Sequence, residues 1–161
     1  MDMESIFESV REAPLLMQLG VVFLISLVPF LEGYVAAPAG IFIGFPAIPT
    51  IVAASLGNWL SVMAVVALYG KLRKRKRDKP ESERSKKRME KARKLFNKYG
   101  VPGVALIGPL VFGHHIGAFI SLVSGASRQY VALWMTIGVL VWTIAAGALA
   151  TAGVDLASRV H

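Results

Sequence analysis

The sequence predicts an all-α integral membrane protein built as an inverted repeat. Each half is a re-entrant helical hairpin followed by a transmembrane helix, and a cytoplasmic amphipathic helix lies between the halves. Three observations lead to this prediction. The chain is 55% apolar, with a mean hydropathy of +0.56, and its apolar residues form long blocks, as in membrane proteins. Only 17% of its residues are charged, against about 25% in soluble domains. Two of the apolar blocks are interrupted by proline, glycine and ionisable residues.

Charge is concentrated in one segment. Between Lys71 and Lys98 lie 15 of the 18 Lys and Arg residues and 4 of the 10 Asp and Glu residues, so this segment carries +11 and the rest of the chain −3. Because the basicity belongs to one loop, we expect no nucleic-acid partner. The chain has no cysteine, which excludes disulfides and thiolate chemistry.

The 161 residues form a single membrane domain, 1–161, in this interpretation. Residues 14–69 form the first half of the repeat, 70–100 the basic cytoplasmic loop and helix, and 101–153 the second half. The N-terminal segment Met3–Ala13 has the pattern of a short interfacial helix, with a frayed tail as the alternative. Its acidic residues argue against a signal peptide.

The first apolar block, Leu15–Leu31, either spans with local thinning of the membrane or forms the descending arm of a hairpin. It overlaps the stretch Val28–Gly44, which holds one carboxylate, Glu32. A carboxylate at membrane depth costs roughly 2.5–3.5 kcal/mol, and broken backbone is tolerated there only beside protein or a water-filled cavity. We therefore predict a broken, re-entrant hairpin with Glu32 near its tip. Its backbone is interrupted by Pro29, Gly33, Pro38, Gly40 and Gly44, of which the last two are spaced for close helix approach.

The next segment, Thr50–Tyr69, is long enough to span about 30 Å as a helix. Asn58 lies near its middle and should hydrogen-bond a neighbouring helix, or take part in a substrate site. Gly70 ends this block, and the cluster Lys71–Arg77 follows. Such a cluster places this end of the helix in the cytoplasm and attracts anionic lipid headgroups.

A cytoplasmic helix is predicted over Pro80–Tyr99, with Glu83→Lys87 and Glu90→Lys94 as ion pairs. It has a narrow apolar stripe, and we expect it to lie along the membrane surface. Gly100-Val-Pro102 stops it. The stripe consists of Met89, Ala92, Leu95, Phe96 and Tyr99.

The second interrupted block is Val101–Gly125, with His114 and His115 at its centre. After Arg128, a last spanning block covers Val131 to about Ala152. The interruptions of the second block include Pro109, Gly113, Gly117 and Gly125.

The two halves have prolines and glycines at corresponding positions. Gly44 aligns with Gly125, and each is followed 13 residues later by a further glycine, Gly57 or Gly138. Around the first hairpin, the aligned pairs are Pro29 with Pro109, Gly33 with Gly113, and Tyr34 with His114. Because the basic loop separates the halves, they should enter from opposite faces and form an inverted repeat, with a site near the midplane. Glu32 would then approach His114 and His115.

Each candidate site residue has two interpretations. Glu32 is a proton carrier or cation site, or else a structural acid bonded to exposed amides. His114 and His115 either exchange protons with Glu32 or make structural hydrogen bonds. A zinc site would need further ligands, for which only Glu32 is available, so no metal is predicted. Arg128 meets a lipid phosphate or serves as an interfacial anchor.

Two runs, Leu31-Glu-Gly-Tyr-Val-Ala-Ala-Pro-Ala-Gly40 and Lys98-Tyr-Gly-Val-Pro-Gly-Val-Ala-Leu-Ile-Gly-Pro109, resemble the small multi-drug export protein family, as do Gly57-Asn58 and Gly117-Ala-Phe119. That family is related to the DedA (VTT) superfamily. The resemblance implies an inner-membrane transport protein and, within DedA relatives, proton-linked movement of small cations or lipid carriers such as undecaprenyl phosphate. Glu32 matches the family's acid, Arg128 matches an arginine only loosely, and the two histidines replace a Pro-Gly-Thr run.

The expected function is therefore transport of a small cation, a drug or a lipid carrier across the inner membrane. The alternative is a non-transporting scaffold that docks through its basic helix. No nucleophile–base pair, P-loop or carboxylate pair points to an enzyme, and no cofactor is expected. Because few helices span, we expect a homo-oligomer.

Overall fold

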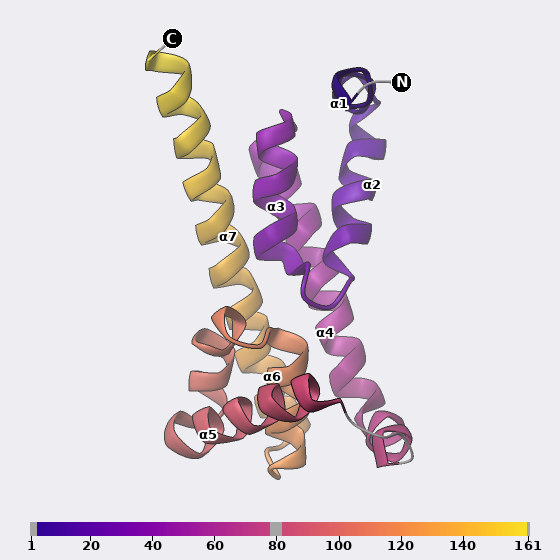
Figure 1. Cartoon of the computed structure of the whole chain (residues 1–161), viewed down its shortest axis with the longest axis vertical. Helices are drawn as coiled ribbons and strands as arrows, with labels where there is room; N and C mark the ends of the chain where they lie inside the picture. Colours follow the sequence, from indigo (N-terminus) through magenta and orange to yellow (C-terminus); the bar gives the residue numbers. More distant parts are fainter. Residues whose placement is uncertain (1–2, 78–81, 161) are drawn as a thin grey trace. The chain divides into compact units, whose positions relative to one another are not determined.

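The structure is a computed structural model that describes residues 3–77 and 82–160. In these ranges the chain is helical and contains no strand, which confirms the all-α prediction. Its helices follow one another with short connections (Figure 1). They are α1 (Met3–Arg11), α2 (Leu15–Ser26), α3 (Glu32–Ile43), α4 (Ala47–Arg77), α5 (Glu83–Leu106), the 3-10 turn η1 (Gly108–Leu110), α6 (His114–Val123) and α7 (Arg128–Val160).

Two of the described helices are long and apolar enough to cross a membrane. The candidate spans are Ala47–Lys71 in α4 and Arg128–Arg159 in α7, with 25 and 32 residues. The apolar helices α2 and α6 have 12 and 10 residues, so at about 1.5 Å per residue they fall well short of the ~30 Å hydrocarbon core. Long helices therefore alternate with pairs of short helical segments: α2 with α3, and the part of α5 (Glu83–Leu106) that follows its interruption at Gly100 with α6.

The first short pair is α2 and α3, which pack against each other (Figure 1). The chain reverses in a turn over residues 27–31, where Phe30 adopts φ 77°. A left-handed conformation is uncommon for a phenylalanine. Pro38 lies inside α3. The predicted interruption of the backbone at Pro38 is therefore wrong, since α3 continues through it.

The helix α4 differs from its predicted range. It continues through Gly70 and reaches Arg77, because one glycine in a helix costs only about 1 kcal/mol. Lys71 is exposed, whereas the side chains of residues 72–77 lie outside the described residues, and with them most of the predicted headgroup contact. The last helix, α7, likewise extends beyond the predicted block at both ends.

The basic helix α5 is interrupted where the sequence predicts. Gly100 has φ 67° and ψ −162°, which are not helical, but the helix then resumes as far as Leu106. The predicted start at Pro80 lies outside the described residues. The apolar stripe of α5 faces protein rather than lipid, since Met89, Ala92, Leu95 and Phe96 pack on the neighbouring core. Tyr99, the last member of the predicted stripe, is exposed.

The described residues form two compact units. Unit 1 comprises those up to Asn58 and those from Leu140 onward, and unit 2 comprises those within Trp59–Val139. The boundaries fall inside α4 and α7, so each unit holds one short-helix pair and one half of each long helix. The core of unit 1 includes Val22, Ala37 and Ala54, and that of unit 2 includes Val104, Ile120 and Met135.

Candidate functional site

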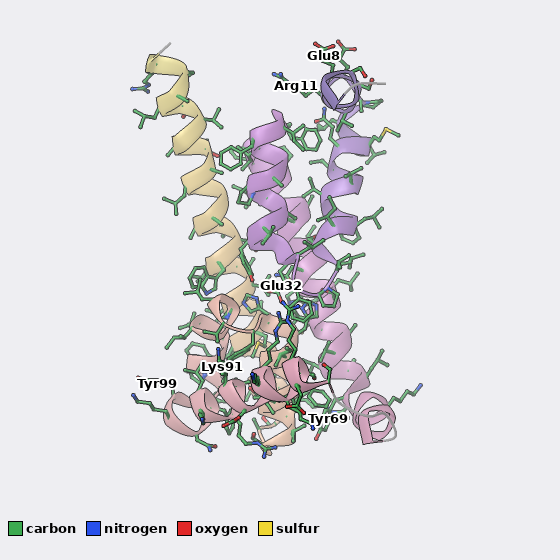
Figure 2. The ribbon with its side chains drawn as sticks, in the orientation of Figure 1. Glu8, Arg11, Glu32, Tyr69, Lys91 and Tyr99 are labelled. Atoms are coloured by element: carbon green, nitrogen blue, oxygen red, sulfur yellow. The ribbon has the colours of Figure 1, made fainter. Side chains whose placement is uncertain are left out.

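The buried carboxylate of unit 1 begins the second helix of the first pair. Glu32 is the first residue of α3 and is 0% exposed (Figure 2). A helix N-terminus stabilises negative charge, because its first amides have no partner within the helix. Two residues after Glu32, the ring of Tyr34 lies 6.4 Å from that of Trp142 in α7. Glu32 thus follows the turn that joins α2 and α3, and its place at the tip of a re-entrant hairpin stays a prediction.

Gly33 brings α3 against two other helices. A Cβ atom on this residue would lie 2.5 Å from Thr143 Oγ1 in α7 and 2.9 Å from the carbonyl oxygen of Ala54 in α4. Both distances are too short for a side chain, so only glycine allows this approach. Oxygen atoms from two helices therefore converge at Gly33, the residue that follows Glu32 in the chain.

Asn58 also belongs to unit 1 and is 0% exposed. It lies one turn beyond Ala54 on α4, and residues four apart share a helix face. The structure thus places Asn58 on the face of α4 that meets α3. Thr143, by contrast, has no special sequence signal, because it is one hydroxyl within an apolar block.

The buried histidine of unit 2 occupies a corresponding place. His114 is the first residue of α6 and is 0% exposed. A Cβ atom on Gly138 of α7 would lie 2.5 Å from the Ala105 carbonyl oxygen and 3.0 Å from His114 Nε2. Glycine therefore permits close packing of α7 on the second short pair.

His115 is half-buried and its Nε2 lies 2.8 Å from Ser61 Oγ of α4. Close by in the chain, Trp59 Nε1 donates to Thr136 Oγ1 of α7 at 2.9 Å. Two polar links thus connect the helices of unit 2. Ser61 and Thr136 carry no signal in the sequence, since hydroxyl residues are common in membrane helices and usually bond to their own backbone.

The predicted site residues are divided between the units. Glu32 and Asn58 belong to unit 1, and the histidines and Arg128 belong to unit 2. Arg128 is the exposed first residue of α7. The predicted approach of Glu32 to the histidines stays a prediction. Among the described residues, no three His, Asp or Glu side chains come together as a metal site would require.

The predicted hairpin glycines and prolines serve different purposes. Gly44, Gly113 and Gly125 have positive φ angles of 107°, 86° and 96°, which suit glycine. Gly40 and Gly117 lie at helix contacts instead, where an added Cβ would meet Thr50 and Val104 at 2.8 and 2.7 Å, respectively. Pro29 is exposed in the first turn, and Pro109 is buried in η1.

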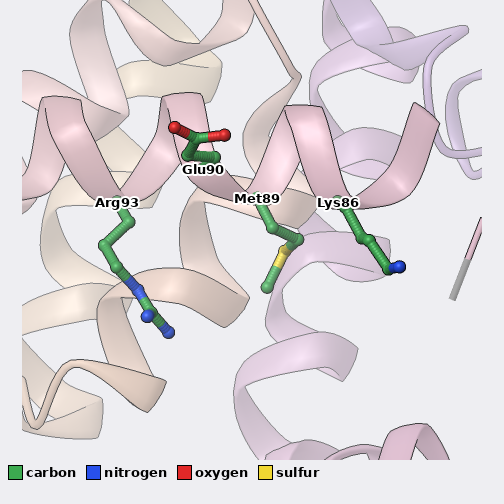
Figure 3. A pocket seen from close by; sticks show the side chains of 4 residues that line it. All are labelled: Lys86, Met89, Glu90 and Arg93. Atoms are coloured by element: carbon green, nitrogen blue, oxygen red, sulfur yellow. The ribbon is translucent and has the colours of Figure 1, made fainter. Parts of the chain in front are cut away.

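Exposed charged side chains of α5 line an open hollow of about 350 Å³. Figure 3 shows its lining residues, Lys86, Met89, Glu90 and Arg93. Glu90 pairs with Lys94 at 2.9 Å, as predicted. Glu83 pairs with Lys86 at 3.0 Å, one residue before the partner expected from the sequence.

An all-helical chain with two apolar helices of membrane length has the features of a helical integral membrane protein. A family model described as "Putative small multi-drug export protein" matches residues 32–145, which is more than half of the chain. The chain belongs to this family, which confirms the resemblance and gives the protein a membrane location. Neither the curated proteins nor the solved structures that were searched include a match.

Proposed function

We propose that the chain is a transporter that moves a small cation, a drug or a lipid carrier across the inner membrane, coupled to protons through Glu32. The supporting observation is a fully buried carboxylate at the tip of two helices that are each too short to span. An intramembrane acid is costly and marks an ion or substrate pathway by default. The family match agrees with export.

The proposal includes two re-entrant hairpins that enter from opposite faces. Gly44 and Gly125 each precede a long helix by three residues. Gly57 and Gly138 follow at the same spacing, and a Cβ on either would lie 2.5 Å from a carbonyl oxygen in the first arm of the preceding pair, that of Phe23 or Ala105. The sequence-aligned glycines thus have one packing role, as an inverted repeat requires.

In this arrangement Glu32 and Asn58 bind the coupled ion, and His114 and His115 provide a second polar position that exchanges protons. Arg128 anchors α7 at the interface. The activity is transport without a catalytic step or cofactor. The basic segment 71–98 faces the cytoplasm, where Lys71–Arg77 contacts anionic headgroups. A second copy of the chain completes the enclosure of the pathway.

Flux in proteoliposomes tests this proposal. The wild-type protein would be reconstituted with a pH gradient, and an organic cation, inorganic cations and a labelled polyprenyl phosphate would be offered in parallel. We expect Glu32→Gln to abolish coupled flux and Glu32→Asp to retain part of it. Glu90→Gln is the matched control, because Glu90 is exposed on α5. Equal flux in wild type and Glu32→Gln would contradict the proposal.

The second candidate function is a membrane scaffold that docks a partner through the basic segment. The observation that favours it is the open, charged hollow on α5 (Figure 3). A scaffold predicts that Glu32→Gln has no effect and that neutralising Lys71–Arg77 removes function. The same pair of variants therefore separates the two candidates.

A further inference from the structure

The three threonines of α7 differ in how their hydroxyls are used. Thr136 donates to the carbonyl oxygen of Ala132 at 2.8 Å, and Thr151 donates to that of Gly147 at 2.9 Å. This bond to the fourth preceding residue is the usual solution for a threonine in an apolar helix. Thr143 lies between them and is 0% exposed, but its Oγ1 has no hydrogen-bond partner among the described residues. The Thr143 hydroxyl is therefore available to bind a ligand.

The free hydroxyl of Thr143 faces the start of α3. Its Oγ1 is the atom nearest to a Cβ built on Gly33, and the Ala54 carbonyl oxygen is the next. Glu32 directly precedes Gly33 in the first turn of α3 and is the only carboxylate of that helix (Figure 2). A hydroxyl from α7 and a carbonyl from α4 thus meet at Gly33, and the fully buried Glu32 is the preceding residue in the same first turn of α3.

These donors define the chemistry of a ligand. All are oxygen atoms, which bind hard cations in preference to soft ones. One buried carboxylate balances one positive charge, whereas a divalent ion would leave a charge uncompensated in an apolar medium. We propose that Glu32, Thr143 and the Ala54 carbonyl form a binding site for a monovalent inorganic cation. This inference rests on the proposed role of Glu32 as an ion site and adds its further ligands.

Cation binding to the purified full-length protein tests the inference. Thermal unfolding would be followed at equal concentrations of NaCl, KCl or choline chloride, and binding of radioactive Na⁺ would be measured directly. The variants are Thr143→Val, which replaces the hydroxyl with a methyl group, Thr143→Ser, which keeps it, and Glu32→Gln. Thr50→Val is the matched control, because Thr50 is another fully buried threonine without a described partner but lies at Gly40.

We expect Na⁺ or K⁺ to raise the unfolding temperature of the wild type above its value in choline chloride. Thr143→Val should lower the apparent cation affinity by about tenfold or more, as loss of one bond to a charged partner implies. Thr143→Ser and Thr50→Val should bind like the wild type, and Glu32→Gln should not bind.

Two results would overturn the inference: equal stability of the wild type in all three salts, or unchanged affinity in Thr143→Val. Equal stability of the wild type in the three salts overturns the inference even if Thr143→Val does not fold. The transport proposal fails separately. Cation binding without flux contradicts transport alone, whereas Glu32-dependent flux without cation binding contradicts this site alone.

Discussion

Four glycines in the two long helices provide a quantitative test of how the short pairs pack. Gly57 and Gly138 each lie against a backbone carbonyl oxygen, at 2.5 Å from a built Cβ. Gly70 in α4 and Gly153 in α7 have nothing within 4 Å of that position. At Gly57 and Gly138, substitution by alanine therefore affects both packing and helix propensity. At Gly70 and Gly153 it affects helix propensity alone.

The expected magnitudes follow from these distances. Alanine gains about 1 kcal/mol over glycine in a helix interior, and this gain applies at all four sites. At Gly57 and Gly138 the Cβ would overlap backbone atoms that cannot rotate away, so we take the upper end of the overpacking cost, about 3 kcal/mol. The matched variants within one helix should thus differ by about 3 kcal/mol, with Gly70→Ala and Gly153→Ala slightly more stable than the wild type.

Thermal unfolding in one detergent, followed by tryptophan fluorescence, measures the difference. For a chain of this length, about 3 kcal/mol corresponds to roughly 6–12 °C. If Gly138→Ala unfolds at the same temperature as Gly153→Ala, the close contact of α7 with Ala105 is wrong. If only one of Gly57→Ala and Gly138→Ala is destabilising, the equivalence of the two halves is contradicted.

Three further predictions concern other sites. Gly125→Ala should cost about 1–2 kcal/mol in unfolding free energy through backbone strain alone, since φ is 96° and nothing lies within 4 Å; unchanged stability would argue against this turn. Ser61→Ala should cost about 0.6 kcal/mol by removing the 2.8 Å contact with His115, and a double-mutant cycle with His115→Ala that shows no coupling would contradict it. Glu90 should titrate by NMR with a pKa below 4.5, because the hydrogen bond from Lys94 and its charge lower it. The stabilisation of the folded state by the Glu90–Lys94 pair is present above pH 4.5 and is lost as the pH falls through the lowered pKa of Glu90. Lys94→Gln should return this pKa toward 4.5.

Features that depend on near neighbours in the chain were predictable. The turn before Glu32 and the interruption at Gly100 lie where the sequence places them, because proline and glycine act on the local backbone. The continuation of α4 through Gly70 was not predicted. A local penalty of about 1 kcal/mol is smaller than the helical preference of the residues around it.

The partners of charged and apolar side chains were less predictable. The helix α5 was expected to lie along the membrane surface, and the structure shows that Ala92 and Phe96 of its apolar stripe pack on the core of unit 2. A stripe shows that one helix face is apolar, and both lipid and protein satisfy that requirement. Only the positions of α4, α6 and α7 within the unit decide between them.

By itself, the sequence determined the class of this protein: hydropathy and confined charge require helices in a membrane, and the motifs around Glu32 establish its family. The tertiary structure alone decided which polar groups meet. Thr136, Thr143 and Thr151 are the same residue type on one helix, yet only Thr143 leaves its hydroxyl without a backbone partner beside Gly33. Hydropathy and helix propensity act between near neighbours, whereas this convergence depends on three segments far apart in the chain.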